Sequence, residues 1–207
     1  PGNRVRETLS EIILGRGRDL MSVVHSTAIP NLYFVPSDRD LHQTDGVIGG
    51  KIGKEFILKG CMKIARTHFD YIIIDCPPNL GNLTLNALVA SDYCIVPSEM
   101  SMFSAEAVND FMLTIETIRE RLNHDIVLLG ILLTKVDRRN LKVNESVMKT
   151  LRYNFGEHLL PVEIPVNSAI AHSQIQGKPI ILTAPESKGA AAYDELVSLV
   201  SRRCRGN

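Results

Sequence analysis

One apolar stretch of the chain ends in an acidic residue. Asp75 directly follows Tyr71-Ile72-Ile73-Ile74 and precedes Cys76-Pro77-Pro78. A carboxylate at the end of a buried strand is what a nucleotide hydrolase uses to hold Mg²⁺, usually through water, because a hard cation prefers carboxylate oxygen. The two prolines favour a stiff, non-helical segment where a nucleotide-sensing switch would lie. An aspartate that merely ends a strand or caps the next helix is the structural alternative.

Two other apolar stretches end in polar side chains. Thr134-Lys135-Val136-Asp137 resembles the element by which GTPases read guanine, although a charged loop explains so short a motif equally well. Pro78 stands where a GTPase has the glycine of Asp-x-x-Gly, which counts against guanine. Pro165 and Asn167 follow a third apolar run, where they favour either a shelf and a hydrogen-bonding edge for a base or an ordinary turn.

The stretch Gly49-Gly50-Lys51-Ile52-Gly53-Lys54-Glu55 has the composition of a phosphate-binding loop. A P-loop reads Gly-x-x-x-x-Gly-Lys-Ser/Thr, so that backbone amides wrap the phosphates and the hydroxyl binds Mg²⁺. Here Ile48 stands where the first glycine belongs, and Glu55 stands where the hydroxyl is needed. The stretch is therefore interpreted as a flexible loop that opens a helix, with Lys51 and Lys54 solvated.

Short continuous apolar runs alternate with helical patterns along the chain. Continuous apolar strands are typical of a parallel sheet that helices cover on both faces. The expected strands are residues 32–35, 71–75, 93–96, 128–134 and 160–164, and the expected helices are about 51–67, 83–90, 104–122, 143–155 and 189–203. This alternation predicts an α/β fold with a doubly wound, mostly parallel sheet, in which ligands bind at the carboxyl ends of the strands.

Length and composition indicate one globular domain over residues 1–207, without linkers or repeats. Acidic and basic residues are equal in number, 23 of each, so the whole chain has no general attraction to nucleic acid. No apolar run approaches the roughly 18 residues of a membrane helix, so a cytoplasmic protein is expected. The four cysteines are far apart, which predicts buried free thiols rather than disulfides or a metal site.

Several further motifs occur together from about residue 70 to the end of the chain. They are residues 71–81, 83–88, Val96-Pro97 with Ala105-Glu106, 130–134, Phe155-Gly156, 164–167, 177–180 and 185–193. In this order and at nearly this spacing, they resemble the ParA/Soj group of chromosome and plasmid partition ATPases, which are MinD relatives with a deviant Walker A motif. Residues 1–69 match only loosely, through residues 32–37. The resemblance implies a P-loop NTPase-like fold.

The resemblance also implies an ATP-dependent dimerisation switch. In this family the ATP-bound homodimer binds DNA without sequence preference, and a centromere-binding partner of the ParB/Spo type stimulates hydrolysis. ATP or ADP and Mg²⁺ are the expected cofactors, and a nucleoid-associated protein is expected rather than a membrane protein. By position, Asp75 matches the aspartate that holds Mg²⁺ through water, and Pro77 and Pro78 match the switch segment. The positions that match the adenine region are Thr134, Pro165 and Asn167.

The chain departs from the family in two respects. The signature Lys-Gly-Gly-x-Gly-Lys-Thr/Ser with its first strand is absent, as is the Asp-x-Asp-Pro-Gln-Gly-Asn strand, whose first aspartate serves catalysis. The chain is therefore expected to be an N-terminally incomplete and weak or inactive ATPase, with no catalytic residue of its own. The family's loop arginines after Ile-Pro are replaced by Val166 and Ala169. Other basic residues would then contact DNA phosphates, unless they form only a solvated face. They are Arg138, Arg139, Lys142, Arg202 and Arg203.

Two alternatives remain open at the level of sequence. One is a MinD-like or other deviant Walker A ATPase with a membrane or metallocluster task. Residues 196–205 count against a membrane task, because they resemble a short core-packing helix rather than a membrane-binding one. The other alternative is a nucleotide-free adaptor that keeps the partner surface of the fold, which the missing phosphate loop favours.

Overall fold

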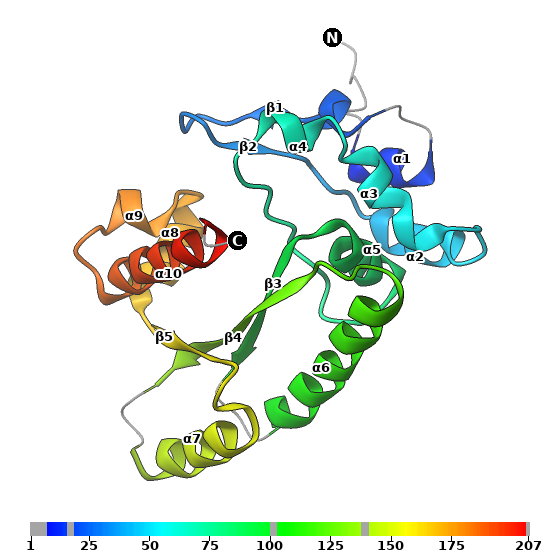
Figure 1. Ribbon diagram of the computed structural model, residues 1–207. Coiled ribbons are helices and arrows are strands. Elements are labelled where there is room, and N and C mark those ends of the chain that lie inside the picture. Colours follow the sequence, from blue (N-terminus) through cyan, green and yellow to red (C-terminus); the bar gives the residue numbers. More distant parts are fainter. Residues whose placement is uncertain (1–7, 16–18, 100–102, 138–140, 206–207) are drawn as a thin grey trace. The chain divides into compact units, whose positions relative to one another are not determined.

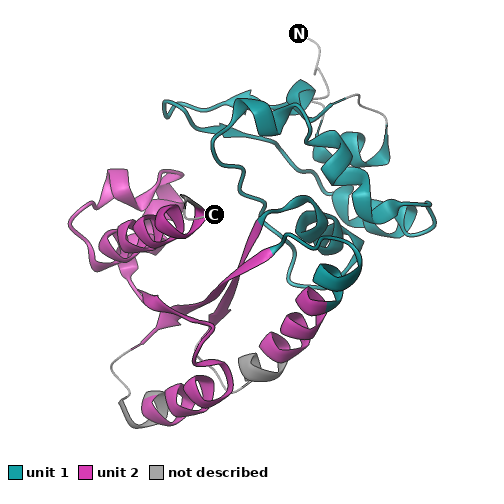
Figure 2. Cartoon of the chain, in the orientation of Figure 1, with its two compact units in different colours: residues 1–92, 117–126 teal, residues 93–116, 127–207 magenta. Residues whose placement is uncertain are grey.

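The structure is a computed structural model, which describes residues 8–15, 19–99, 103–137 and 141–205, without the side chains of 103–106, 141–144 and 205. The chain divides into two compact units, which Figure 2 shows in different colours. Residues 1–92 and 117–126 form unit 1, and residues 93–116 and 127–207 form unit 2. Each unit has an apolar core of its own. A single domain over residues 1–207 stays a prediction.

Unit 2 is built on a three-stranded parallel sheet (Figure 1). Its strands are β3 (Tyr93–Glu99), β4 (Val127–Val136) and β5 (Leu159–Pro165), in the order β3-β4-β5. Central β4 is buried without interruption over residues 129–133. Such burial requires a layer on each face of the strand, and it explains why the sequence of β4 is continuously apolar. The prediction of a parallel α/β sheet is confirmed.

One face of this sheet is covered by the helices α6 (Phe103–Arg121) and α7 (Leu141–Phe155). Their apolar side chains share a core cluster with every second residue of the middle of β4, Ile131 and Leu133. This alternation is the two-residue period of a strand. The predicted helices over residues 104–122 and 143–155 are confirmed.

The other face of the sheet is covered by α8 (Ser168–Gln176) and α10 (Lys188–Arg205), with the short α9 (Ile180–Thr183) between them in the chain. Leu132 of β4 points into this layer, where it joins the cluster that contains Leu199 of α10. The apolar side of α10 is therefore used for core packing, as its sequence predicted. In the part of the chain that the structure describes, no helix combines the length and apolarity needed to cross a membrane.

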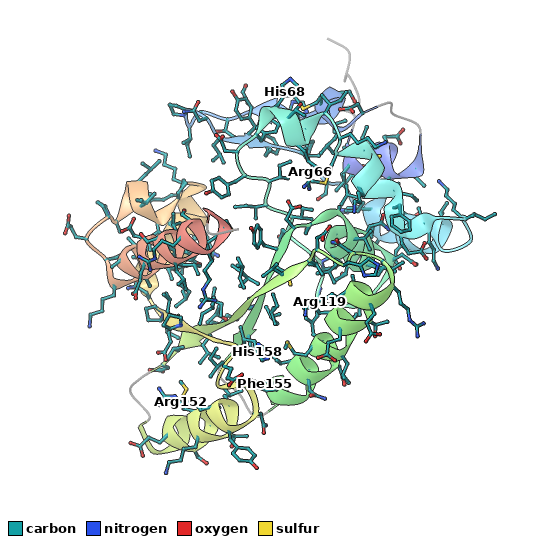
Figure 3. The ribbon with its side chains drawn as sticks, in the orientation of Figure 1. Arg66, His68, Arg119, Arg152, Phe155 and His158 are labelled. Atoms are coloured by element: carbon teal, nitrogen blue, oxygen red, sulfur yellow. The ribbon has the colours of Figure 1, made fainter. Side chains whose placement is uncertain are left out.

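Gly130 allows β4 and β5 to approach each other closely. Its φ is +143°, and a Cβ there would lie 2.6 Å from Leu160 Cδ2 and 2.7 Å from the carbonyl oxygen of His158. That same carbonyl accepts a hydrogen bond of 2.7 Å from the Ile131 N–H. His158 lies in the turn between α7 and β5, where its N–H donates to the Phe155 carbonyl over 2.8 Å (Figure 3). Only glycine fits this crowded backbone contact without displacing its neighbours.

Unit 1 is mainly helical. Its helices are α1 (Leu9–Leu14), α2 (Leu41–Ile48), α3 (Ile57–Cys61), α4 (Ala65–His68) and α5 (Asn82–Ala90), with the 3-10 turns η1 (Leu20–Val23) and η2 (Lys54–Phe56). An antiparallel ribbon joins β1 (His25–Ser26) to β2 (Tyr33–Phe34), which lies within the strand predicted at 32–35. Helices α1 and α3 share one core cluster, to which Ile12, Leu58 and Met62 contribute.

Two predicted elements of unit 1 are wrong. Residues 71–75 are extended, but no strand of the described residues pairs with them, and Ile73 remains 93% exposed. An isolated extended segment lacks the neighbour that would take its backbone hydrogen bonds, so it does not form a strand. The single helix predicted over 51–67 is broken into η2, α3 and α4. Gly53, at φ +68°, delays its start, and Gly60 weakens its centre.

Candidate functional site

Asp75 lies at the end of the extended segment of unit 1, with its side chain exposed. The chain then turns through Pro77 and Pro78 into α5. The hydroxyl of Thr84 in α5 reaches back to this turn and donates to the Asn79 carbonyl over 2.6 Å and, more weakly, to the Pro77 carbonyl over 3.5 Å. The predicted switch segment is therefore tied to α5 by hydrogen bonds.

The N-terminus of α5 already has an anionic partner. The Asp45 carboxylate of α2 accepts a hydrogen bond of 2.9 Å from the Leu83 N–H, and Asn82 donates to the Asp45 carbonyl over 3.1 Å. A Cβ on Gly81 would lie 3.0 Å from the same carboxylate. A helix N-terminus attracts negative charge, and here a protein carboxylate supplies it. Sequence reasoning missed Asp45, because a capping residue that is distant in the chain leaves no local pattern.

The three residues predicted for the adenine region lie at one edge of the sheet in unit 2. Thr134 is near the carboxyl end of β4, Pro165 ends β5 opposite Val136, and Asn167 follows directly. Val166 continues the pairing, since its N–H donates to the Val136 carbonyl over 3.1 Å. The structure thus brings together three predicted positions at the carboxyl ends of parallel strands, where ligands bind in folds of this class.

The polar groups at this edge are partly committed to the fold. Asn167 caps α8, because its Oδ1 accepts a hydrogen bond of 2.8 Å from the Ala169 N–H. Its Nδ2 group is then the part of the side chain that can donate to a base. The Thr134 hydroxyl donates to the Ser98 carbonyl over 3.3 Å. Lys135, at φ +52°, forms an ion pair with Glu99. A base at this edge would therefore meet Asn167 as its principal donor.

The predicted DNA contacts are described only in part. Arg138 and Arg139 lie outside the described residues, and Lys142 belongs to α7 without a described side chain. Arg202 and Arg203 are exposed on α10. The Arg203 guanidinium donates to the Leu129 carbonyl of β4, so it helps to hold α10 on the sheet. Arg202 is the more available of the two for a phosphate.

The glycine- and lysine-rich stretch does not have the geometry of a phosphate loop. It follows α2 and leads into the helical turn η2 and then α3, as predicted, but its lysines are not simply solvated. Lys51 Nζ donates to the Leu14 carbonyl and Lys54 Nζ to the Gly49 carbonyl, each over 3.2 Å. The backbone amides of Lys51 and Phe56 are likewise used, in hydrogen bonds to the carbonyls of Ile48 and Gly53. These donors are therefore not directed together at a ligand.

The four cysteines are free thiols, as the sequence predicted, but the prediction that they are buried is wrong: Cys76 is exposed, and Cys61, Cys94 and Cys204 are only partly buried. Desolvation by the surrounding protein raises the pKa of the Cys76 thiol, and the adjacent Asp75 carboxylate raises it further. The thiol therefore remains protonated at neutral pH. Among the described residues, no three His, Cys, Asp or Glu side chains gather in a way that could hold a metal ion. Asp75 would have to hold Mg²⁺ together with water and phosphate oxygens.

Taken one unit at a time, the described residues fit the Mg²⁺ and the nucleotide that the resemblance implies only in part. The metal end fits, because Asp75 offers an exposed carboxylate. The base of the nucleotide fits, because the Asn167 Nδ2 group can donate a hydrogen bond while Oδ1 caps α8. The phosphate end does not fit, because Lys51 and Lys54 are bound to carbonyls and Asp45 occupies the N-terminus of α5.

Comparisons with known proteins agree with these observations. The sequence family described as "AAA domain" matches residues 2–128. The sporulation initiation inhibitor protein Soj of Bacillus subtilis is 33% identical over 190 residues, which are 91% of this chain and 74% of Soj. The chromosome partitioning protein ParA of Caulobacter vibrioides is 33% identical over 202 residues, which are 97% of this chain and 75% of ParA.

Solved structures give the same fold. Cobyrinic acid a,c-diamide synthase from Mycobacterium smegmatis, with a bound ATP analog and magnesium, superposes with a TM-score of 0.79 at 28% identity. The match covers 98% of this chain and 74% of the synthase. That structure shows that this fold carries a nucleotide and Mg²⁺ in a related protein. Because the sequence similarity to Soj and ParA extends over nearly the whole chain, the chain belongs to the ParA/Soj family of chromosome-partitioning proteins.

Proposed function

We propose that this protein acts in plasmid or chromosome segregation as a partition ATPase of the ParA/Soj type. The observation that carries the proposal is the 33% identity to Soj and ParA over more than nine-tenths of the chain. In the proposed cycle, ATP and Mg²⁺ drive homodimerisation, and the dimer binds DNA without sequence preference at the nucleoid. A centromere-binding protein of the ParB type then stimulates hydrolysis and release.

The proposed roles of the residues follow from their positions. Asp75 holds Mg²⁺ through water, and the turn at Pro77 and Pro78 passes the state of the nucleotide to α5, to which Thr84 ties it. Asn167 donates to the base from the edge of the sheet, with Thr134 and Pro165 beside it. DNA phosphates are contacted by basic residues near the end of β4 and on α10, which include Arg138, Arg139, Lys142 and Arg202.

We propose further that the chain as given hydrolyses ATP weakly or not at all. Phosphoryl transfer depends on cations and amides around the triphosphate, and the sequence contains no P-loop that could supply them. The lysines of the 49–55 stretch do not substitute, because they are bound to carbonyl groups. This observation favours a second candidate function, a nucleotide-free adaptor that keeps the partner surface of the family.

Nucleotide binding and turnover separate these candidates. Calorimetric titration of the chain with ATP and Mg²⁺ should give weak binding, and phosphate release should stay near background. The product of the complete gene should instead dimerise with ATP and be retained on duplex DNA only in the ATP state. Tight ATP binding by the chain would exclude the adaptor and the role assigned to the missing phosphate loop.

The genomic neighbourhood gives an independent test of partition. An adjacent gene for a ParB-type DNA-binding protein is expected, and that protein should accelerate turnover by the complete gene product. The absence of such a gene, together with no ATP-dependent retention on DNA, would contradict a partition role and leave a MinD-like or other deviant Walker A task.

A further inference from the structure

Residues 49–53, which we call the 49–53 loop, join α2 to η2 in unit 1 and contain one isoleucine, Ile52. Ile52 has a relative exposure of 105%, the largest among the exposed large apolar residues of the described part of the chain. Two other apolar side chains of residues 47–56 are also open, Val47 at 57% and Phe56 at 44%. A single exposed apolar residue needs no explanation, whereas three within ten residues, one in α2, one in the loop and one in η2, are a candidate contact surface.

The 49–53 loop is held in place by hydrogen bonds at both ends. Lys51 Nζ donates to the Leu14 carbonyl at the end of α1, and Lys54 Nζ donates to the Gly49 carbonyl just after α2, both over 3.2 Å. Asn86 of α5 donates to the Lys54 carbonyl over 2.7 Å. The loop and the start of η2 are therefore tied to α1 and to α5, and the Lys54–Gly49 hydrogen bond closes the loop on itself. Fixing the backbone in advance lowers the entropy cost of binding through Ile52.

The stretch of sequence that contains Ile52 is basic. Residues 47–63 contain four lysines, Lys51, Lys54, Lys59 and Lys63, against one acidic residue, Glu55. Lys59, in α3, and Lys63, in the turn between α3 and α4, are both exposed. Arg66 does not add to this charge, because it donates to the Ala90 carbonyl over 3.2 Å and pairs with Asp92 at 2.6 Å (Figure 3). An otherwise neutral chain thus concentrates positive charge beside an exposed apolar side chain.

We propose that the 49–53 loop is a docking site for a segment of another protein that carries an apolar side chain flanked by Asp or Glu. Ile52 anchors the apolar side chain, and Lys59 and Lys63 attract the acidic residues, which raises the association rate and sets the orientation. Charge complementarity favours an acidic segment over a basic one. A nucleic acid would gain little from Ile52, since its affinity comes mainly from phosphate contacts. This docking site is independent of nucleotide binding, so it goes beyond the proposed partition function.

The test begins with the intact chain as bait for a random linear peptide library displayed on phage. Enriched peptides should contain an apolar residue flanked by acidic ones. Synthetic copies should bind the wild-type chain, and Ile52→Ser should weaken them about tenfold, as expected for an interface anchor. The double variant with Lys59→Glu and Lys63→Glu should weaken them several-fold and flatten their salt dependence. None of these exposed side chains contributes to the core, and an unchanged melting temperature will confirm that the variants fold.

Ile175→Ser is the matched control. Ile175 lies on α8 in unit 2 and is 84% exposed, so its loss removes a similar apolar side chain from another surface. Peptide binding should survive this change. The proposal would be overturned if the Ile52→Ser variant bound the peptides as tightly as the wild type, or if the enriched peptides lacked acidic residues. Duplex DNA and anionic lipid vesicles are tested in the same way. If either ligand binds the wild type and the Ile52→Ser variant but not the lysine double variant, the surface is a site for that ligand instead.

Discussion

The Asp38 side chain links the segment before α2 to the start of α1 in unit 1. Its carboxylate accepts hydrogen bonds from the hydroxyls of Thr8, just before α1, and Ser10, the latter over 2.7 Å. These side-chain hydrogen bonds lower the pKa of Asp38 below its ordinary value of 3.8, with backbone hydrogen bonds from Asp40 and Leu41 adding to the effect. Because hydrogen bonds to the ionised form stabilise it, the folded state binds a proton on Asp38 less readily than the unfolded chain does.

This pKa gives a pH dependence with a definite sign. A depressed folded-state pKa contributes stability that is present above the unfolded pKa and is lost as the pH falls through the folded value. Asp38→Asn should therefore lower the free energy of unfolding at neutral pH by no more than about 1 kcal/mol, because the half-buried carboxylate is screened by solvent. The difference should shrink below about pH 4. Denaturant melts of both proteins from pH 3 to pH 7 will measure it, and a pH-independent difference would contradict this role of the charge.

At the scale of elements, Asn86 links α5 to the segment that contains the 49–53 loop. It is 1% exposed, its Oδ1 accepts a hydrogen bond of 3.1 Å from the Leu58 N–H, and its Nδ2 donates to the carbonyls of Lys54 and Asn82 over 2.7 Å and 2.9 Å. The Asn86 amide thus pairs with a backbone N–H in the first turn of α3 and with the Lys54 carbonyl just after the 49–53 loop. This side chain of α5 adds hydrogen bonds to the apolar packing that holds the broken helical segment between residues 54 and 61.

Asn86→Ala should therefore cost about 2–3 kcal/mol, because it leaves buried backbone groups without partners. The change should also loosen residues 49–58 before the rest of unit 1 unfolds. Hydrogen exchange will detect this as lost protection at the amides of Leu58 and Phe56. Asn79→Ala is the control, since the Asn79 side chain is exposed, and it should change the unfolding free energy by less than about 0.5 kcal/mol. Equal stability of the two variants would show that the amide network contributes nothing.

Sequence predicts a helix or strand well when the pattern of apolar residues within that element is enough to identify it. β4 is continuously apolar because both its faces are buried, and α6 carries a full apolar stripe, so both were predicted within a few residues. Residues 71–75 have the same strand pattern, yet a strand also needs a neighbour, which no local pattern reveals. The caps supplied by Asp45 and Asn86 were missed for the same reason, since both depend on a contact between distant parts of the chain.

At the scale of the whole molecule, the balance of charge limits how DNA could be bound. The 23 acidic and 23 basic residues cancel, so any affinity for DNA must come from a local group of cations. The motifs predicted the family and the edge of the sheet that holds Thr134, Pro165 and Asn167. They could not show that Arg203 is used to hold α10, because hydrogen bonding of a surface arginine to a strand carbonyl has no sequence pattern.

Arg202 and Arg203 should therefore behave differently when each is changed in the complete gene product. Arg202→Ala should weaken ATP-dependent DNA binding several-fold and lower the slope of log affinity against log salt by about 1, as for the loss of one phosphate contact. Its melting temperature should stay unchanged, because Arg202 is exposed. Arg203→Ala should lower the melting temperature, since the Leu129 carbonyl loses its donor. DNA binding measured over a range of salt concentrations, beside thermal melts, separates the two effects. An Arg202→Ala protein with an unchanged salt slope would exclude this face of α10 from the DNA interface, and an Arg203→Ala protein with unchanged stability would release Arg203 for it.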